Sequence, residues 1–442
     1  MRHKEAYEKV FRLLEEHHRW FDRVIPLIAS ENIVSPAVKE AMISDFGHRY
    51  AEGWPGERVY AGCRFIDEVE LLCIDLMKEL FHCRHADVRP TSGVAANLAI
   101  YTAFTKAGDV MLAQSIPSGG HISMGPDIGK TGAKIGGTAG AVARLKVEYL
   151  PFDEENFTVD ADRAAKAIEE HEPKLVMLGA SVFLFPAPVR EISEAAHAVG
   201  AVVNYDAAHV AGLIGAGFFQ DPLGEGADTV SMSTHKTLPG PQHGAIITNS
   251  EEHFEKIKKA VFPGVTSNHH LHNVAALAVA LAEMLEFGRE YCSQIIRNAK
   301  RLAEALCGEG FKVVGEKRGF TESHTILVDI WEHGNGAWAE KALEEAGIIV
   351  NRNLLPWDIR LGRSFREPGG IRLGVSEVTR LGMKESDMDE VARFIREVII
   401  DKREPKEVFQ RVSEFRKEFR NIHYCFESGR LAYEYINLRL QS

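Results

Sequence analysis

Cysteine and long apolar runs are the two features that the chain has little of. The six cysteines in 442 residues form no Cys-x-x-Cys pair, which favours reduced thiols over a disulfide framework. The most apolar stretches, 175–189 and 274–285, are too short or too interrupted by Pro and Glu to cross a bilayer. The N-terminus is charged and predicts an amphipathic helix rather than a signal peptide. We therefore expect a cytoplasmic protein without a membrane segment.

Positive charge is also in deficit. The formal net charge is −11 and there is no long basic run, so we expect no nucleic-acid surface. A small anionic ligand remains compatible, because a local pocket can be basic on an acidic protein. The histidine-rich runs 269–272 and 82–85 lack the closed four-ligand spacing of a structural metal site, and the cysteines at 63, 73 and 83 are too widely spaced for a zinc knuckle. We expect no bound metal.

Short apolar runs alternate with helical patterns between residues 89 and 249. Fully apolar strands separated by helices predict an α/β fold with a mostly parallel sheet covered on both faces. The expected strands are 109–114, 145–152, 175–181, 201–208, 229–234 and 245–249, and helices are expected over 160–170 and 189–199.

The rest of the chain predicts two further parts. A long helical stretch over 273–308 leads out of the large domain, and the strands expected at 311–315, 324–330, 348–353 and 370–374 predict a smaller α+β domain. The last forty residues are charged and are expected to be helical. We therefore expect an N-terminal helical arm (1–35), a large cofactor-binding domain (36–285) and a small C-terminal domain with a helical tail (286–442).

Residues 125–144 break the regular pattern. They are rich in glycine and contain Lys130 and Lys134, which predicts a loop. A tolerated surface insertion and an active-site flap that meets a ligand's tail are equally open interpretations.

Asp206 and Lys236 each lie at the carboxyl end of an expected strand, the edge where open α/β sheets bind ligands. Pyridoxal-phosphate chemistry needs a lysine amine to form an imine and a carboxylate to keep the pyridine nitrogen protonated. Two such residues alone are weak support, because solvated pairs of this kind are common. The flanking sequence makes the hypothesis specific.

The flanking motifs are LIASEN (27–32), RYAEGWPGERVYAG (49–62), SGVAAN (92–97), GGHI (119–122), DAAHVAGL (206–213), STHKT (233–237), FPG (262–264) and GIRLG (370–374). Together they resemble the serine hydroxymethyltransferases, in order and approximate spacing, from about residue 25 to 385. VFPGVTSNHHLH and NLLPWD are similar to the archaeal branch. The resemblance implies the aspartate-aminotransferase-like fold of pyridoxal-phosphate enzymes (fold type I), with a smaller α+β C-terminal domain.

The resemblance also implies roles around the cofactor ring. Lys236 would form the Schiff base, Asp206 would pair with the pyridine nitrogen, and His121 would stack on the ring. Ser181 and His209 would hydrogen-bond the phenolic oxygen of the cofactor and the substrate.

A second set of residues is implied for the cofactor phosphate. Ser92 and Gly93 open an expected helix, so their backbone N–H groups suit an anion, and His235 would assist them. Tyr50 and Gly264 would reach this phosphate from a second subunit.

For the substrate, Arg372 would grip the carboxylate as a bidentate fork, with Ser30 beside it. Glu52 would be the acid–base group near the serine hydroxyl, and Tyr60 would line the same pocket from the partner subunit. Thr234, or the serine before it, would tune the lysine. The implied catalytic residues are Lys236, Glu52, His121, Asp206, His209, Tyr60 and Thr234.

The chain departs from the common bacterial and eukaryotic forms at several positions. GPQHG carries Gln242 and His243 where an arginine is usual, Val59 replaces a tyrosine, VFLFPAP follows Ser181, and VTSNHHLH replaces a glycine-rich QGGP stretch. These changes cluster near the expected pterin side and subunit interface. They therefore question the one-carbon carrier more than the cofactor.

We expect a pyridoxal-phosphate-dependent enzyme that interconverts serine and glycine and exchanges a one-carbon unit with a reduced pterin, either of the tetrahydromethanopterin type or tetrahydrofolate. The expected assembly is a homodimer with shared active sites, or a tetramer built from two dimers. The alternative is a pterin-independent aldolase or transaldolase on threonine-like or α-methylserine substrates, which would share every cofactor residue. A non-catalytic pyridoxal-phosphate protein is disfavoured because Glu52 is present, and a transaminase does not explain LIASEN.

Overall fold

A computed structural model describes residues 3–126 and 137–440. Lys130 and Lys134, on which the flap hypothesis depends, lie outside the described residues. The flanks of this segment form two short helical turns, η2 (Ile122–Met124) and η3 (Thr138–Val142), so the expected loop is partly helical at its C-terminal side.

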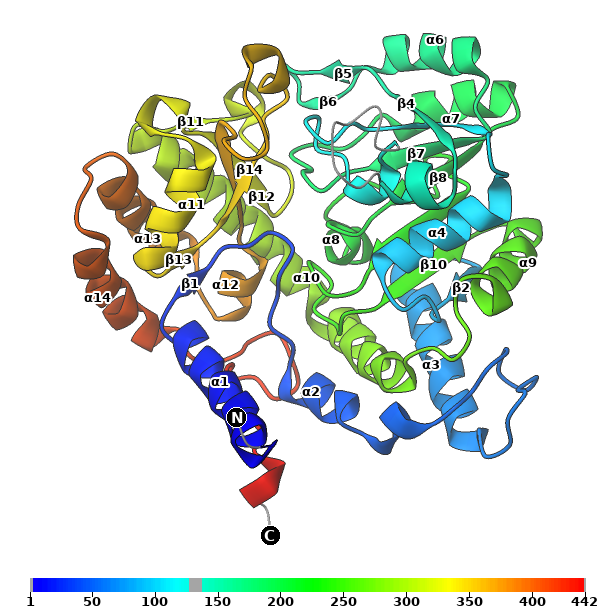
Figure 1. The fold of residues 1–442 in the computed structure, drawn as a ribbon, viewed down its shortest axis with the longest axis horizontal. Coiled ribbons are helices and arrows are strands. Elements are labelled where there is room, and N and C mark those ends of the chain that lie inside the picture. The colour runs from blue at the N-terminus through cyan, green and yellow to red at the C-terminus, as the bar shows by residue number, and fades with distance from the viewer. Residues whose placement is uncertain (1–2, 127–136, 441–442) are drawn as a thin grey trace.

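A seven-stranded sheet forms the centre of the larger part of the chain (Figure 1). Its order is β2-β10-β9-β8-β7-β3-β4, and the five strands from β9 to β4 are parallel. The strands are β2 (His85–Asp87), β3 (Val110–Ala113), β4 (Lys146–Tyr149), β7 (Leu175–Gly179), β8 (Val202–Asp206), β9 (Thr229–Ser233) and β10 (Gly244–Thr248). The predicted mostly parallel sheet is confirmed.

Three details differ from the predicted strands. The short edge strand β2 was not predicted, and β10 runs antiparallel to both of its neighbours. The expected strand 145–152 stops at Tyr149, and the chain continues into a small hairpin of β5 (Phe152–Asp153) and β6 (Thr158–Val159). Pro151 accounts for this break, because proline has no N–H to donate to a neighbouring strand.

Both faces of the sheet are buried, as the apolar strands predicted. In β7, Val176 and Leu178 belong to one apolar core, whereas Leu175 and Met177 belong to another on the opposite face. Helix α4 packs against β9 and β10, and α3 packs against α8 and α10. The helices of this part are α3 (Arg64–Phe81), α4 (Gly93–Phe104), α6 (Ala161–His171), α7 (Val189–Ala198), α8 (Ala211–Gly215) and α9 (Glu251–Lys259), followed by the turn η4 (Ala260–Val265).

Helix α10 (Leu271–Gly308) is continuous over 38 residues and connects the two parts of the fold (Figure 1). The domain boundary expected at 285/286 therefore falls inside one helix. Among the described helices, α10 alone has the length and apolar composition of a membrane span. Because 61% of its most apolar window is buried within the fold, it has the character of a core helix.

The smaller part contains a four-stranded antiparallel sheet of order β11-β12-β15-β14. Its strands are β11 (Lys312–Val313), β12 (Thr325–Asp329), β14 (Asn351–Asn353) and β15 (Gly370–Gly374). The expected strand 348–353 divides, because β13 (Ile348–Ile349) pairs instead with β1 (Ile25–Pro26) near the N-terminus. The helices and turns here are α11 (Gly336–Glu345), α12 (Ser376–Arg380), α13 (Glu385–Ile399), η5 (Glu316–Arg318), η6 (Trp331–His333) and η7 (Ile359–Leu361).

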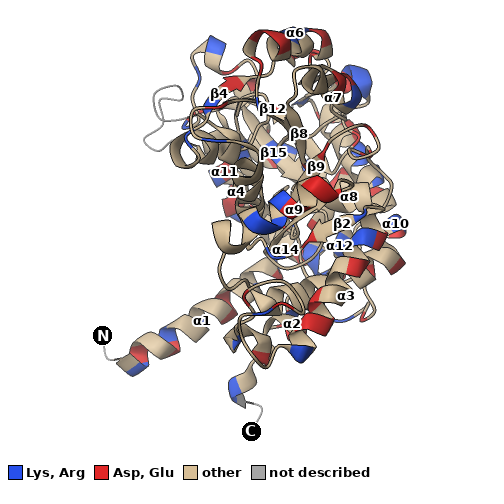
Figure 2. Cartoon of the chain, turned by 90° about the vertical axis from the view of Figure 1, so that its right-hand side faces the viewer, with Lys and Arg blue, Asp and Glu red and all other residues tan. Residues whose placement is uncertain are grey.

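The N-terminal helix and the C-terminal tail contact each other, since His18 Nδ1 lies 3.0 Å from the Tyr433 carbonyl oxygen. Helix α1 (His3–Phe21) has no buried residue, carries charges of both signs and projects from the body (Figure 2). It is followed by α2 (Pro36–Met42) and η1 (Asp45–His48). The tail is helical only in α14 (Pro405–Phe415) and in the short turns η8 (Arg416–Glu418) and η9 (Leu438–Leu440), so the prediction of a helical tail holds only in part. The buried Arg416 donates from Nε to the Val24 carbonyl at 2.6 Å, which ties the tail to the N-terminal segment.

Candidate active site at the carboxyl edge of the sheet

A cavity of about 210 Å³ lies beside the carboxyl ends of β8 and β9 and the N-terminus of α4. Ligands bind at this edge in open α/β sheets. The lining residues are Ser92, Gly93, Val94, Asn97, His121, Ala180, Ser181, Asp206, Ala208, His209, Ser233, His235 and Lys236. Eight of the residues implied by the motifs therefore share one cavity.

Lys236 lies just beyond the end of β9, and its Nζ donates a hydrogen bond to Ser233 Oγ at 3.1 Å. Burial lowers the pKa of Lys236 to about 8, with a contribution from Arg372, while Asp206 acts in the opposite direction. A lysine with a lowered pKa supplies the neutral amine that attacks a carbonyl carbon.

Asp206 ends β8 and is held by two donors. Asn97 Nδ2 donates to Oδ2 at 2.8 Å, and the Ala208 backbone N–H donates to Oδ1 at 2.9 Å. Among the described residues, no basic side chain forms an ion pair with this buried carboxylate. An oriented, unpaired carboxylate facing a cavity fits a protonated ring nitrogen.

Asn97 is a site residue that the sequence reasoning missed. Its side chain has two further partners besides Asp206. Oδ1 accepts from Ser231 Oγ at 2.6 Å, and Nδ2 also donates to Ser123 Oγ at 3.0 Å. The available signal was its place at the end of SGVAAN, one turn into α4.

Two of the three histidines of the cavity, His121 and His209, are driven towards the neutral form by burial. His121 accepts at Nδ1 from the Ser123 backbone N–H at 3.2 Å, and burial lowers its pKa. Burial also lowers the pKa of His209 well below its usual range, and its Nδ1 has no hydrogen-bond partner among the described residues. The His209 ring stacks on His324, with centroids 5.7 Å apart. Neutral rings suit an apolar contact and a hydrogen bond to a ligand.

The N-terminus of α4 supplies an anion site. Ser92 is its N-cap and accepts from the Ala95 N–H at 3.1 Å, so its hydroxyl oxygen is already engaged by the helix. A Cβ at Gly93 would lie 2.3 Å from Ser233 Oγ, so only glycine fits there without a shift. The first N–H groups of a helix lack intrahelical partners and point at anions. His235 lies beside them, and burial lowers its pKa to about 4.

Arg372, on β15, borders the cavity through Ser181. Its NH1 donates to the Ser181 carbonyl at 2.7 Å, and its Nε donates to Asn351 Oδ1 at 3.1 Å. No described carboxylate pairs with this buried guanidinium, whose pKa is lowered by burial to about 10. A buried, unpaired guanidinium is costly unless a ligand anion completes it.

Ser30 is half-buried and follows Ala29, which packs against the end of β15. Two residues further on, Asn32 Nδ2 donates to the Lys236 carbonyl at 2.6 Å and to the Tyr291 hydroxyl at 2.8 Å. Asn32 is a second missed residue, and its signal was the LIASEN motif.

The hydroxyl groups of Thr234 and Ser233 have different hydrogen-bond partners. The Thr234 hydroxyl donates to the Pro241 carbonyl at 2.7 Å, within the turn that follows β9. The hydroxyl in contact with the lysine amine is that of Ser233.

Besides Arg372, Ser30 and Thr234, four of the implied residues do not line this cavity: Tyr50, Glu52, Tyr60 and Gly264. The Tyr50 and Tyr60 side chains are 54% and 45% exposed, and their ring centroids lie 5.1 Å apart. Glu52 Oε1 accepts from Ser267 Oγ at 2.5 Å, and Gly264 is exposed in η4. Tyr50, Tyr60 and Gly264 are therefore exposed and Glu52 is half-buried, and none of the four lines the cavity of its own chain.

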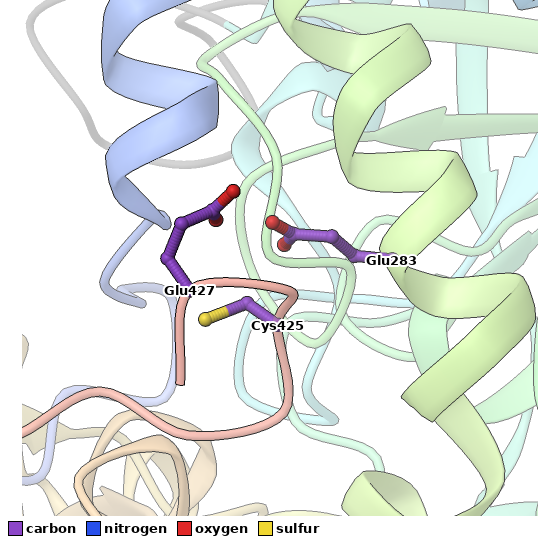
Figure 3. A group of neighbouring side chains, drawn as sticks. All are labelled: Glu283, Cys425 and Glu427. Carbon is purple, nitrogen blue, oxygen red and sulfur yellow. The ribbon is translucent and has the colours of Figure 1, made fainter. Parts of the chain in front are cut away.

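One group of potential metal ligands occurs among the described residues, and it was not predicted. The ligand atoms of Glu283, Cys425 and Glu427 lie within 4.8 Å of one another, and Figure 3 shows the two carboxylates pointing towards each other. Glu283 already accepts from the Arg380 guanidinium at 2.9 Å, which balances its charge. None of the three residues lines the cavity. In the histidine run, His269 Nε2 lies 2.8 Å from Glu70 Oε2.

A buried lysine and an oriented carboxylate line one cavity at the carboxyl edge of a mostly parallel α/β sheet, with an anion site at a helix N-terminus. This arrangement defines the class of pyridoxal-phosphate enzymes of fold type I.

Comparison with known proteins narrows the class to one family. The family model described as serine hydroxymethyltransferase matches residues 4–395. A protein named serine hydroxymethyltransferase from Korarchaeum cryptofilum is 62% identical over 431 residues, covering 98% of this chain and 99% of that protein. Those of the same name from Nitrosopumilus maritimus and Methanopyrus kandleri are 56% and 54% identical, covering 99% and 98% of this chain and 99% and 98% of their own lengths. The chain belongs to the serine hydroxymethyltransferase family, and the resemblance inferred from its motifs is confirmed.

Proposed function

We propose that this chain interconverts serine and glycine and exchanges the one-carbon unit with a reduced pterin. The observation that carries the proposal is that Lys236 and Asp206 line one cavity, with the unpaired guanidinium of Arg372 beside it. The name that these relatives share supports the same activity.

The residues of the cavity fit pyridoxal phosphate. Lys236 would hold it covalently, Asp206 would face its ring nitrogen, and the N-terminus of α4 would hold its phosphate. When bound, the protonated ring draws electrons from the bonds at the substrate Cα and so allows the bond to the hydroxymethyl carbon to break. The neutral His121 and His209 would contact the ring and its phenolic oxygen without adding charge.

Arg372 would orient the substrate. Its NH2 has no hydrogen-bond partner among the described residues, while Ser181 and Asn351 hold NH1 and Nε in place. A carboxylate bound to this fixed guanidinium has a defined direction, so the bond that breaks is held in one orientation relative to the ring.

We propose a homodimer with shared sites. Tyr50, Tyr60, Glu52 and Gly264 are accessible and do not line the cavity of their own chain, which supports their reaching a neighbouring one. The variants Lys236→Ala and Glu52→Gln, each of which should retain only a small part of the activity, test this when they are mixed, unfolded and refolded together. Random pairing places both wild-type residues at one site of each heterodimer, so about a quarter of wild-type activity should return. No recovery after heterodimers have been detected would contradict shared sites.

We propose the cytoplasm as the place of action. All six cysteines are free, as expected of a protein in a reducing compartment.

The function is tested by incubating the purified holoenzyme with serine and either tetrahydrofolate, a tetrahydromethanopterin-type carrier or no pterin. We expect glycine formation to depend on a pterin, with the better carrier identified by its kcat/KM. Serine cleavage at the same rate without a pterin would contradict the proposal and would favour the aldolase alternative.

A further inference from the structure

Glu52 is held by a residue that the family motifs do not assign. Ser267 Oγ lies 2.5 Å from Glu52 Oε1, and the two residues are 215 positions apart in the sequence. Among the described residues, Ser267 provides the one side-chain hydrogen bond to the Glu52 carboxylate. Oε2 is therefore left open for a proton.

The next residue fixes the backbone of the same segment. Asn268 Oδ1 accepts from the Ala51 N–H at 2.9 Å, and Asn268 Nδ2 donates to the Arg49 carbonyl at 3.0 Å. Both partners lie within three residues of Glu52. The 267–268 segment thus holds the Glu52 segment by its main chain as well as by the carboxylate.

Arg58 holds the opposite side of this segment. Its NH1 donates to the carbonyls of Ala51 and Gly53, at 2.7 and 2.6 Å, so it grips the main chain on either side of Glu52. The Arg58 side chain is 3% exposed and is paired with Glu70 at 2.7 Å. The same Glu70 carboxylate oxygen contacts His269 Nε2, so Glu70 connects Arg58 with the 267–269 segment.

Ser267, Asn268 and His269 are consecutive in the run VTSNHHLH (265–272), where the chain passes from η4 to α10. A hydroxyl donor bound to one carboxylate oxygen fixes the orientation of the group, and so the direction in which the other oxygen points.

We propose that Ser267 is a positioning residue for Glu52, which holds Oε1 and presents Oε2 for proton exchange with the substrate or the one-carbon carrier. The inference rests on the proposed function and deepens it, because it names what directs the acid–base group. Its chemical consequence is confined to steps in which a proton passes through Glu52.

The experiment compares four variants of the holoenzyme: Ser267→Ala, Ser267→Thr, Glu52→Gln and the double variant Ser267→Ala/Glu52→Gln. The matched control is Ser428→Ala, because Ser428 is an exposed serine in the tail that does not line the cavity. Pterin-dependent kcat and KM for serine are measured, together with cofactor affinity in the absence of substrate.

We expect Ser267→Ala to lower kcat about tenfold, as for the loss of one hydrogen bond to a charged group, with KM and cofactor affinity unchanged. Ser267→Thr keeps the hydroxyl and should restore kcat. In the Glu52→Gln background, removing the Ser267 hydroxyl should have no further effect.

An unchanged kcat in Ser267→Ala would overturn the inference, as would a full-sized loss that persists in the Glu52→Gln background. Either result leaves the proposed function intact if the wild-type enzyme still forms glycine in a pterin-dependent manner. Failure of that wild-type reaction would count against the proposed function itself.

Discussion

The pKa of the Lys236 amine depends more on the position of the residue in the fold than on its neighbours in the sequence. Within STHKT, Lys236 Nζ donates to Ser233 Oγ, while burial and the guanidinium of the distant Arg372 lower the pKa of Lys236 to about 8. The opposing influence of Asp206 keeps the pKa from falling further. The amine is therefore partly neutral near physiological pH and is able to react with an aldehyde.

This pKa predicts the pH dependence of cofactor capture by the apoprotein. Only the neutral amine attacks, so the capture rate should rise about tenfold per pH unit below the pKa and level off above it. We expect the midpoint near pH 8. Stopped-flow absorbance after mixing apoprotein with pyridoxal phosphate gives the rate at each pH. A rate that keeps rising beyond about pH 10, as for an ordinary lysine, would contradict this expectation.

Arg372 gives a second prediction at the residue scale. Arg372→Lys keeps the charge but loses the planar fork and the two fixed bonds to Ser181 and Asn351. We expect KM for serine to rise about 10- to 100-fold, as for a lost charge-assisted pair, with cofactor affinity nearly unchanged. Arg360→Lys is the control, because Arg360 is an exposed arginine paired with Glu154. An unchanged KM would show that another group binds the substrate carboxylate.

At the scale of elements, the segment after β1 is placed by its fit to the end of β15. A Cβ at Gly374 would lie 2.3 Å from Ala29 Cα, so the two backbones meet where only glycine fits. This contact positions Ser30 and Asn32, and Asn32 in turn holds the carbonyl of Lys236. The close packing at Gly374 thus affects the position of Lys236.

Gly374→Ala should therefore destabilise the protein by about 1–3 kcal/mol, as for overpacking in a well-filled core. Thermal unfolding of the holoenzyme and the apoprotein measures the change. The matched control is Gly308→Ala at the end of α10, where an added Cβ meets nothing within 4 Å and alanine is a better helix former. Equal unfolding midpoints for the two variants would show that the β1 segment adjusts without strain.

At the scale of the whole molecule, the tail closes over the N-terminal segment. Residues 396–442 lie beyond the range that the family model matches, and yet the tail is bonded to the body at several points. Lys39 Nζ donates to the Ala432 carbonyl at 2.6 Å, and the Tyr433 hydroxyl donates to Glu377 Oε1 at 2.5 Å. Glu377 lies on α12, three residues after the end of β15, the strand that carries Arg372. The tail therefore contacts the helix that follows an active-site strand.

The burial of Glu377 makes the stability of this contact between the tail and the body dependent on pH. Burial raises the pKa of Glu377 from its ordinary value of 4.5 to about 7, against the smaller effect of the Tyr433 hydroxyl. Because the folded pKa is raised, this group's contribution to stability is complete below about pH 4.5 and is lost as pH rises through about 7.

We therefore expect Glu377→Gln to flatten the pH dependence of stability. The free energy of unfolding of the wild type relative to this variant should fall by an amount on the order of 2 kcal/mol between about pH 4.5 and pH 7.5. Urea unfolding at a series of pH values measures the difference. A difference that is constant with pH, or that rises with it, would contradict the assignment.

The sequence determined the chemistry and the general fold of this protein. Apolar runs spaced by helices predicted the parallel sheet, because burial on both faces imposes a local pattern. The motifs placed Lys236 and Asp206 at the ends of neighbouring strands, and the structure brings them to one cavity. These features are encoded within a few residues of each position, so they can be read without knowing what lies across the fold.

Contacts between distant segments were decided by the tertiary structure alone. The hydroxyl beside the lysine amine belongs to Ser233, because the turn after β9 directs Thr234 to Pro241. Asn97 meets Asp206, and Ser267 meets Glu52, across 109 and 215 positions of sequence. No local period or propensity records such pairs, since each depends on how helices and loops pack against the sheet.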